Sequence, residues 1–369
     1  MIFASLFSGF SLADIGAMLA GCELAWGIEI DPAIAEISRQ LGHQIFCRSV
    51  TEIDFRKLQK PDILWASPPC TNFSIAKEDA QESEGDIELA KAIIRAIITL
   101  EPRYFILENV EAYKRSKSLK LIEDALYAHG YWIDRQVLNA ADFGVPQTRR
   151  RLILRAVKGA FIQPMPQAQK WIGWHQAIED LLPNLPETKL ADWQVTRLNA
   201  AFEKEQNLEN RQFVIEKSGA ILVPGSNATS FTFRHQNEPS ATISDTQRVG
   251  NRPKAVLICE KPVTVTRALL IQSKNANQEY GSGFRESGEP ATTVITDGKP
   301  SHQPKALLIP ALNSARVVQI SSRCLARFQT LPDWYNLPAK NNLACKGIGN
   351  GVPCSFAKAI VQSLIGENS

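Results

Sequence analysis

The sequence predicts an α/β fold, with a doubly wound and mostly parallel sheet and a second, smaller β-rich domain. Short apolar runs alternate with helical patterns through the first 157 residues, and several runs are apolar throughout, as strands buried on both faces are. The second domain is expected from the length of 369 residues, because a single hydrophobic core rarely grows beyond about 250–300 residues.

Apolar runs mark the expected strands of the sheet. In chain order they are residues 2–7, 23–30, 44–50, 62–67, 104–110, 131–138 and 151–157. Helical spacing of apolar residues predicts helices over 12–20 and 87–100, and Gly21 is a plausible end of the first. Residues 356–364 show the same spacing and are expected to form a closing helix. Ligands of such folds bind at the carboxyl ends of the strands.

The composition changes after Lys158. Residues 159–310 are rich in Pro, Asn, Gln, Ser and Thr, with helical spacing around 174–182 and 193–205. The order of segments therefore predicts one α/β domain interrupted by an insert. The expected divisions are 1–157 for the first part of the α/β domain, 158–309 for the inserted domain and 310–369 for the segment that completes the α/β domain.

The middle region contains an internal repeat. FRHQNEPSATISDTQRVGNRPKAVLI begins at Phe233, and FRESGEPATTVITDGKPSHQPKALLI begins at Phe284, an offset of 51 residues. Two copies are too few for a solenoid, so two similar β-rich units are the simplest explanation. The units could be duplicated scaffold, or their loops could touch a substrate.

Charge and cysteine content limit the class of protein. With 41 Lys and Arg against 38 Asp and Glu, the formal net charge is +3, which excludes a histone-like polycation and by itself argues against nucleic acid as the main partner. Residues 134–170 nevertheless carry seven Lys and Arg against two Asp. No run approaches the ~18 apolar residues of a membrane span, and Asp14 interrupts the apolar N-terminus. The seven scattered cysteines predict a cytoplasmic protein without disulfides or a metal site.

Two strand ends have the features of a nucleoside site. The first strand passes through Phe7-Ser8-Gly9 into a helix, so backbone N–H groups could approach a ligand there, although a plain tight turn is as consistent. Glu29 ends the second strand about 20 residues later, where an acid suits ribose hydroxyls. Together they favour a cofactor that contains a nucleoside.

Three further segments carry reactive or charged side chains. Cys70 follows paired prolines after the fourth strand, and an inert buried cysteine is the alternative. Glu108 ends the fifth strand, as a partly desolvated acid or as an ordinary solvated strand end. Arg149 and Arg151 open the seventh strand on one expected face, which suits a phosphate or a base edge unless this is a solvated basic strand start.

In this order, the motifs resemble those of the DNA (cytosine-5) methyltransferases. They are Phe-x-Gly, the Glu of strand two, Pro-Pro-Cys-x-x-Phe-Ser, Glu-Asn-Val, Gln-x-Arg-x-Arg and Ile-Gly-Asn-Gly-Val-Pro, and Arg323–Pro332 resembles R-E-x-A-R-L-Q-x-F-P. The resemblance covers 1–157 and 307–369, and the middle region sits where that family keeps its target-recognition domain. It implies a Rossmann-like, S-adenosylmethionine-dependent fold and a bacterial-type modification enzyme that makes 5-methylcytosine in double-stranded DNA.

The resemblance also implies a covalent mechanism. Cys70 would add to C6 of a cytosine flipped out of the duplex, and C5 would then take the methyl group of S-adenosylmethionine. Glu108 would bond N3 and the exocyclic amine, Arg151 would hold O2, and Arg149 would organise the Cys70 loop. Residues 75–86 resemble the mobile loop that closes over the base.

Cofactor residues follow from the same resemblance. Phe7, Ser8 and Gly9 match the methionine-side turn, Glu29 the ribose ligand, Ile30 the adenine contact, and Pro69, Asn350 and Val352 other lining positions. Four positions depart from the family pattern. Ser5 replaces an acid before Leu-Phe, Ser11 a second Gly, Ser49 an acid that contacts the adenine amine, and Cys324 a Glu. These departures are expected to weaken cofactor binding.

Two alternatives remain open: a tRNA cytosine-5 methyltransferase, and a catalytically weak, sequence-specific DNA-binding relative. The long middle region favours DNA, because reading the major groove needs extra surface. A nicotinamide-dependent dehydrogenase would explain neither Pro-Pro-Cys nor Gln-x-Arg-x-Arg. The expected setting is the bacterial cytoplasm at the nucleoid, away from the membrane, with a monomer on double-stranded DNA and a cognate restriction endonuclease acting separately.

Overall fold

The computed structural model describes residues 1–69, 82–188 and 315–366 and several short segments between them. The short segments are 220–224, 234–235, 237–240, 253–259, 267–272, 284–286 and 304–309. The chain divides into two compact units. The first contains Met1–Ile178, Glu238–Gln247 and Ser321–Ser369, and the second contains Glu179–Asn237 and Arg248–Ile320.

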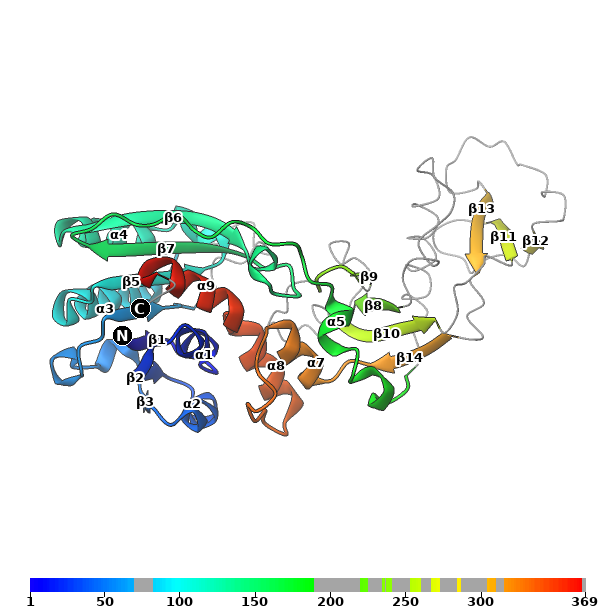
Figure 1. The fold of residues 1–369 in the computed structure, drawn as a ribbon, viewed down its shortest axis with the longest axis horizontal. Helices are drawn as coiled ribbons and strands as arrows, with labels where there is room; N and C mark the ends of the chain where they lie inside the picture. The colour runs from blue at the N-terminus through cyan, green and yellow to red at the C-terminus, as the bar shows by residue number, and fades with distance from the viewer. Residues whose placement is uncertain are drawn as a thin grey trace. The chain divides into compact units, whose positions relative to one another are not determined.

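A seven-stranded sheet forms the centre of the first unit (Figure 1). Its strands are β1 (Ile2–Leu6), β2 (Glu23–Glu29), β3 (Gln44–Cys47), β4 (Ile63–Ala66), β5 (Tyr104–Asn109), β6 (Tyr131–Asn139) and β7 (Arg150–Lys158). In the spatial order β3-β2-β1-β4-β5-β7-β6, the first five strands run parallel, and β7 runs antiparallel to β5 and β6. All the strands predicted for this sheet are confirmed.

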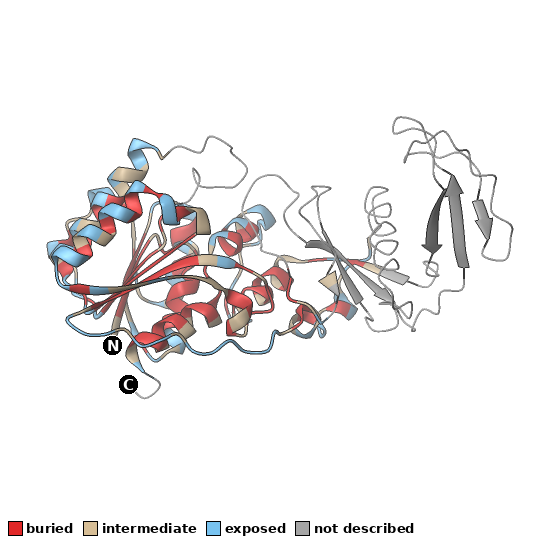
Figure 2. Cartoon of the chain, turned by 90° about the horizontal axis from the view of Figure 1, so that it is seen from above, coloured by how far each residue is buried: buried red, intermediate tan, exposed pale blue. Residues whose placement is uncertain are grey.

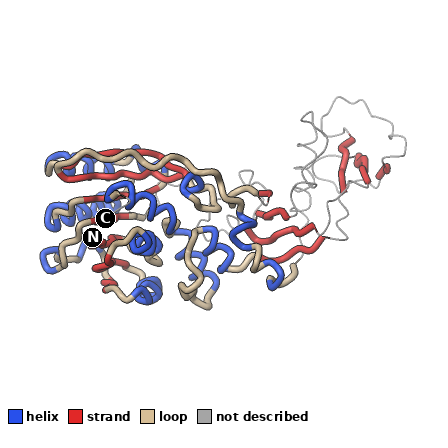
Figure 3. The backbone as a smooth tube through the Cα atoms, in the orientation of Figure 1, coloured by secondary structure: helices blue, strands red, loops and turns tan. Residues whose placement is uncertain are grey.

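Helices fill most of the connections between the strands (Figure 3). They are α1 (Leu12–Leu19), α2 (Pro32–Ser38), α3 (Glu84–Leu100), α4 (Lys117–Ala128), α5 (Trp174–Ile178), α7 (Ser322–Phe328), α8 (Asn341–Asn350) and α9 (Cys354–Ile365). The helices predicted over 12–20, 87–100 and 356–364 are confirmed as α1, α3 and α9. The helical pattern of 193–205 lies outside the described residues. In the part of the chain that is described, no helix is both long and apolar enough to span a membrane.

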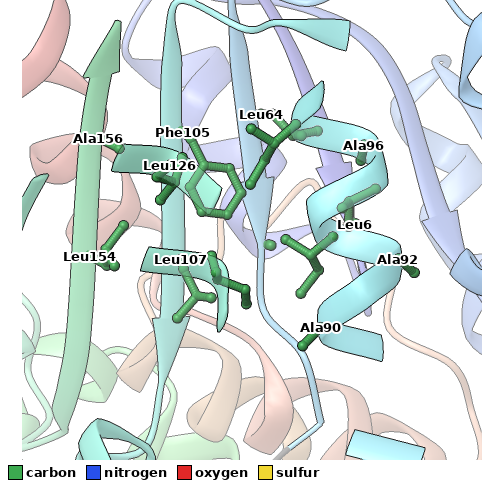
Figure 4. Packing of buried hydrophobic residues seen from close by; sticks show 14 of the residues in the cluster. Leu6, Leu64, Ala90, Ala92, Ala96, Phe105, Leu107, Leu126, Leu154 and Ala156 are labelled. Carbon is green, nitrogen blue, oxygen red and sulfur yellow. The ribbon is translucent and has the colours of Figure 1, made fainter. Parts of the chain in front are cut away.

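Apolar side chains cover both faces of the sheet, which explains why several of its strands are almost entirely apolar. Leu6, Leu64 and Phe105 lie in one buried cluster with residues of α3 and α4, and Figure 4 shows α3 packed over these strand positions. Phe3 and Trp65 belong to a second cluster, with residues of α1 and α9. Figure 2 shows the resulting pattern: the strands are buried, whereas the helices are exposed on the side that faces away from the sheet. The predicted doubly wound α/β fold is confirmed.

The helices α1 and α9 approach each other closely because α1 has a glycine at the crossing. A Cβ at Gly16 would lie 2.6 Å from the carbonyl oxygen of Cys354. Any larger residue would therefore force the two helices apart. This contact fastens the C-terminal helix to the first helix of the chain.

The first unit extends beyond β7 to α5, past the division at residue 157 that the composition suggests. Trp174 is fully buried, and its N–H donates to the carbonyl oxygen of Glu238 at 2.7 Å. Two further backbone hydrogen bonds of 2.7 Å join Ser240 to Pro146 and Thr148. Contacts between segments distant in the chain thus set this boundary. The functional divisions at 157/158 and 309/310 stay predictions.

The described residues of the second unit form two antiparallel sheets. The strands are β8 (Ala220–Pro224), β9 (Arg234–His235), β10 (Pro253–Cys259), β11 (Arg267–Gln272), β12 (Phe284–Glu286), β13 (Pro304–Ile309) and β14 (Ala315–Gln319). In one sheet β8 lies between β9 and β10, and in the other β11 lies between β12 and β13. The first of these sheets also contains β14, which pairs with β10. The repeated segments supply β9 and β10 to one sheet and β12 and β13 to the other, whereas the strands between them, β8 and β11, lie outside the repeat.

Candidate active site

The carboxyl ends of four strands meet at one edge of the sheet. Leu6 of β1 pairs with Ile28 of β2 on one side and with Ala66 of β4 on the other, and Ala66 pairs with Leu107 of β5. From β1 the order of strands runs to β2 and β3 on one side and to β4 and β5 on the other. Open α/β sheets bind their ligands where the strand order divides in this way. The register brings together the segments that follow these strands.

The turn after β1 is held against the end of β2. Phe7, Gly9 and Ser11 have positive φ angles of 60°, 56° and 58°, so the chain reverses sharply before α1. The N–H of Gly9 donates to Oε2 of Glu29 at 2.9 Å, and the N–H of Asp31 donates to Oε1 of the same carboxylate at 2.8 Å. The structure thus places the predicted methionine-side turn and the predicted ribose ligand in direct contact.

The other predicted cofactor residues have different surroundings. Ile30 follows the end of β2 and is 67% exposed, so its apolar side chain is open to solvent beside Glu29. Pro69 is exposed after β4, and Asn350 is exposed at the end of α8. Val352 is 3% exposed and packs in the cluster that contains residues of α1 and α9.

Ser49 stands where the resemblance expects an acid. Its Oγ lies 2.7 Å from Oγ1 of Thr51 and accepts a hydrogen bond from the N–H of Thr51 at 3.3 Å. This hydroxyl stabilises the start of a short 3-10 turn, Val50–Glu52. The structure therefore shows a local capping contact for Ser49.

An ion pair that the sequence did not indicate lies beside this edge. Nζ of Lys346 in α8 donates to Oδ2 of Asp31, the N-cap of α2, at 2.8 Å. This hydrogen bond is the main reason that the pKa of Asp31 falls below its usual value. The two residues are 315 positions apart, so no local pattern could have linked them.

Glu108 and Arg151 form a largely buried pair. Nε of Arg151 lies 3.1 Å from Oε1 of Glu108, and the side chains are 14% and 6% exposed. The geometry is that of an ion pair without an aligned hydrogen bond, because Oε1 accepts none from the part of the chain that the structure describes. A carboxylate this buried would be costly without its cation. The antiparallel pairing of β5 with β7 brings the two residues together.

Arg149 and Arg150 have other partners. Arg149 is 2% exposed, and its Nη1 donates to the carbonyl oxygen of Gly349 at 3.1 Å. The side chain of Arg150 is 67% exposed and lies 3.2 Å from the carboxylate of Glu111. Arg149 thus connects the start of β7 to α8, whereas Arg151 faces Glu108.

Cys70 lies outside the described residues, as do positions 71–81. The residues before it are described: the amide Nδ2 of Asn109 donates to the carbonyl oxygen of Pro68 at 3.1 Å. This bond ties the Pro-Pro segment to the end of β5, next to Glu108. The assignment of Cys70 as nucleophile stays a prediction.

Comparison with known proteins finds methyltransferases that are similar to this chain over most of its length. A family model described as C-5 cytosine-specific DNA methylase matches residues 1–366. The type II methyltransferase M.XorII of Xanthomonas oryzae is 26% identical, over 96% of this chain and 82% of its own length. Among solved structures, a mutant of Spodoptera frugiperda DNMT2 has a TM-score of 0.60 at 13% identity and covers 99% of both chains. A putative DNA modification methyltransferase encoded within an Escherichia coli prophage has a TM-score of 0.59 at 17% identity and covers 98% of both.

Proposed function

Since the chain belongs to the family of C-5 cytosine-specific DNA methylases and is therefore a DNA cytosine methyltransferase, we propose that it methylates C5 of a flipped-out cytosine within a specific double-stranded sequence. We further propose that the reaction runs through a covalent bond between Cys70 and C6 of the base. This family generally uses S-adenosylmethionine, and we assign the same methyl donor to this chain.

The Glu108–Arg151 pair carries this proposal. Cytosine presents an acceptor at O2, an acceptor at N3 and a donor at its exocyclic amine. The guanidinium of Arg151 offers donors for O2. The carboxyl group of Glu108, 3.1 Å from this guanidinium, matches N3 and the exocyclic amine. Burial of both side chains strengthens such contacts, since little water competes there. Such a base must leave the duplex to reach them.

The proposed role of Cys70 follows from the chemistry of the ring. C5 is a poor nucleophile until a thiolate adds to C6 and shifts the electron pair of the C5–C6 double bond toward C5. Glu108 assists by polarising N3 during this addition. The bound cofactor supplies an electrophilic methyl group. Loss of the C5 proton to water then restores the double bond and releases Cys70.

The residues at the β1–β2 edge fit S-adenosylmethionine. Gly9 has no atom within 4 Å of the position of a Cβ, so the turn leaves open space beside it. Glu29 lies next to this turn through its bond to the Gly9 N–H, and an acid at the end of β2 suits ribose hydroxyls. Exposed Ile30 offers an apolar surface for the adenine ring.

We assign the reading of the DNA sequence to the middle region, 158–309. Each copy of the repeated sequence supplies two strands that flank a third strand in an antiparallel sheet, and this common arrangement supports a duplicated function for the region. As with type II modification enzymes, a separate restriction endonuclease with the same recognition sequence is the proposed partner. The proposal further holds that the chain binds DNA as a monomer in the bacterial cytoplasm.

Bisulfite sequencing of cellular DNA tests the proposal. Cells would express the wild-type chain, Cys70→Ala, or the matched control Cys22→Ala, which removes a buried thiol at the start of β2. Wild type and Cys22→Ala are expected to produce 5-methylcytosine in one sequence context, and Cys70→Ala none. Methylation by Cys70→Ala would overturn the covalent mechanism. Unmodified DNA together with modified tRNA in wild-type cells would overturn DNA as the substrate.

A further inference from the structure

Four exposed cations border the candidate active site and take no part in the proposed chemistry. They lie in the 3-10 helix Glu111–Arg115 that follows β5, at the first position of α4, and at the start of β7. We call these cations the basic rim: Lys114, Arg115, Lys117 and Arg150. The end of β5 and the start of β7 also carry Glu108 and Arg151, so the rim stands at the same edge of the sheet as this pair.

Buried residues between the cations fix the backbone of the rim. Tyr113 and Leu119 are 2% and 1% exposed and pack in the cluster that contains residues of α3. Ser116, between them, accepts a hydrogen bond from the N–H of Leu119 at 3.0 Å and caps α4. The cations that alternate with these buried positions therefore face solvent from a backbone that packing and capping hold in place.

The carboxylates described near the rim leave it positively charged. Oε1 of Glu111 lies 3.0 Å from Nζ of Lys114, and Oε2 of Glu111 lies 3.2 Å from Nη2 of Arg150. One negative charge is thus shared by two cations. Among the described residues, neither Arg115 nor Lys117 has a carboxylate partner for its side chain. Both side chains are therefore available to an anion from outside the chain.

Lys117 occupies a position that the fold itself does not favour. It is the first residue of α4, whose first turn contains no acidic residue. A cation at this end of a helix opposes the helix dipole. The N–H groups of Lys117 and Ser118 donate to the carboxylate of Glu82 at 2.7 and 2.8 Å, so the helix end is capped without the lysine side chain. A cation kept where it does not help the helix indicates a partner outside the fold.

We propose that the basic rim binds the phosphates of the DNA strand next to the flipped cytosine. This inference rests on the proposed function and adds a backbone contact on the first unit to it. A base held by Glu108 and Arg151 stays linked to its strand, so the adjoining phosphates pass the edge where the rim stands. Lysine and arginine side chains suit phosphate oxygens, and such contacts position a duplex independently of its sequence.

Salt-dependent binding of DNA to the full-length chain tests the rim. The probe is a fluorescein-labelled duplex of mixed sequence, and its affinity is measured by anisotropy between about 50 and 200 mM KCl. The test variant is Arg115→Gln with Lys117→Gln. The matched control, Lys60→Gln with Arg103→Gln, removes the same two kinds of charge from exposed positions before β4 and β5, at the opposite edge of the sheet.

The expected change follows from the release of counterions. Each phosphate contact contributes about 0.9 to the slope of log affinity against log salt concentration. Arg115→Gln with Lys117→Gln should therefore reduce the slope by about 2 and weaken binding about 30-fold near physiological salt. The control should bind as the wild type does. Arg115→Lys with Lys117→Arg, which exchanges the two cations, should also keep the wild-type slope.

The outcomes separate the possible failures. If the wild-type chain binds labelled tRNA and not the duplex, DNA as the proposed substrate is wrong, and the rim has another partner. If the wild type binds the duplex and the test variant keeps its slope, the inference is wrong while the proposed function stands. An equal loss in the control means that binding follows net charge, which also overturns the inference. Thermal unfolding identifies a test variant that does not fold, and Arg150→Gln, with an expected slope change of about 1, then decides the question.

Discussion

Replacement of Ser11 by glycine is expected to stabilise this protein. Ser11 is the N-cap of α1, and its φ of 58° and ψ of 32° place it in the left-handed region, where a side chain with a Cβ is strained. This backbone conformation also keeps its hydroxyl from capping the helix. The residue is 0% exposed, and its Oγ has no hydrogen-bond partner among the described residues.

The two effects can be given separate magnitudes. A buried hydroxyl without a partner costs about 1 kcal/mol or somewhat more relative to an apolar group. At a positive φ, alanine is less favourable than glycine by about 1 kcal/mol, after allowance for the greater freedom of glycine in the unfolded chain. Ser11→Ala removes only the hydroxyl, so it should raise the free energy of unfolding by about 1 kcal/mol. Ser11→Gly removes both costs and should raise it by about 2 kcal/mol.

Urea unfolding and thermal melting of the three proteins measure these differences. For a cooperative unit of this size, about 2 kcal/mol corresponds to a rise in melting temperature of roughly 4–8 °C. A less stable Ser11→Ala variant would mean that the hydroxyl has a stabilising partner. Equal stability of the alanine and glycine variants would mean that the left-handed backbone is not strained. Either result would refute the reasoning.

Two further predictions concern charged pairs. Arg151→Ala should lower kcat/KM for methyl transfer to DNA about 100-fold, or about 2.7 kcal/mol. The substitution removes a hydrogen-bond donor and leaves Glu108 without its cation. Unchanged kinetics in a radiolabelled methyl-transfer assay would contradict this role of Arg151. Lys346→Ala should cost at most about 1 kcal/mol at pH 7, since the pair with Asp31 is partly exposed. The pKa of Asp31 is lowered in the folded chain, so this contribution is present above about pH 4 and disappears as the carboxyl group is protonated at lower pH. Urea unfolding of the wild type and of Lys346→Ala below about pH 4 checks this assignment. If the two proteins still differ in stability there, the difference does not come from the pair with Asp31.

The strands of the catalytic unit could be predicted because their sequence pattern follows directly from burial. Residues such as Phe3 and Leu6 face opposite sides of the sheet, and helices cover both sides, so apolar residues occupy the strand on both faces and Ser5 is its one polar residue. The boundary of the unit could not be predicted in the same way. The contact of Trp174 with Glu238 joins segments 64 residues apart and depends on their positions in space.

The candidate site was predictable in its residue types but not in its contacts. Glu108 and Arg151 were each expected at the ligand edge, and the pairing of β5 with β7 decides that they face each other. Arg149 was expected beside Arg151, yet its guanidinium is bound to Gly349 at the end of α8. Asp14 was visible as an acid within an apolar run, but its partners Ser5 and His43 were not.

The sequence by itself determined the α/β fold class, the order of the motifs and the reactive groups that this methyltransferase can use. These properties follow from the periodicity of apolar residues and from the chemistry of single side chains, which are local. Only the tertiary structure decided that Glu108 lies against Arg151, and that the buried carboxylate of Asp14 accepts a hydrogen bond from Ser5. Hydrogen bonds and ion pairs act over about 3 Å and need alignment. They therefore depend on strand register and on the approach of segments that are distant in the chain.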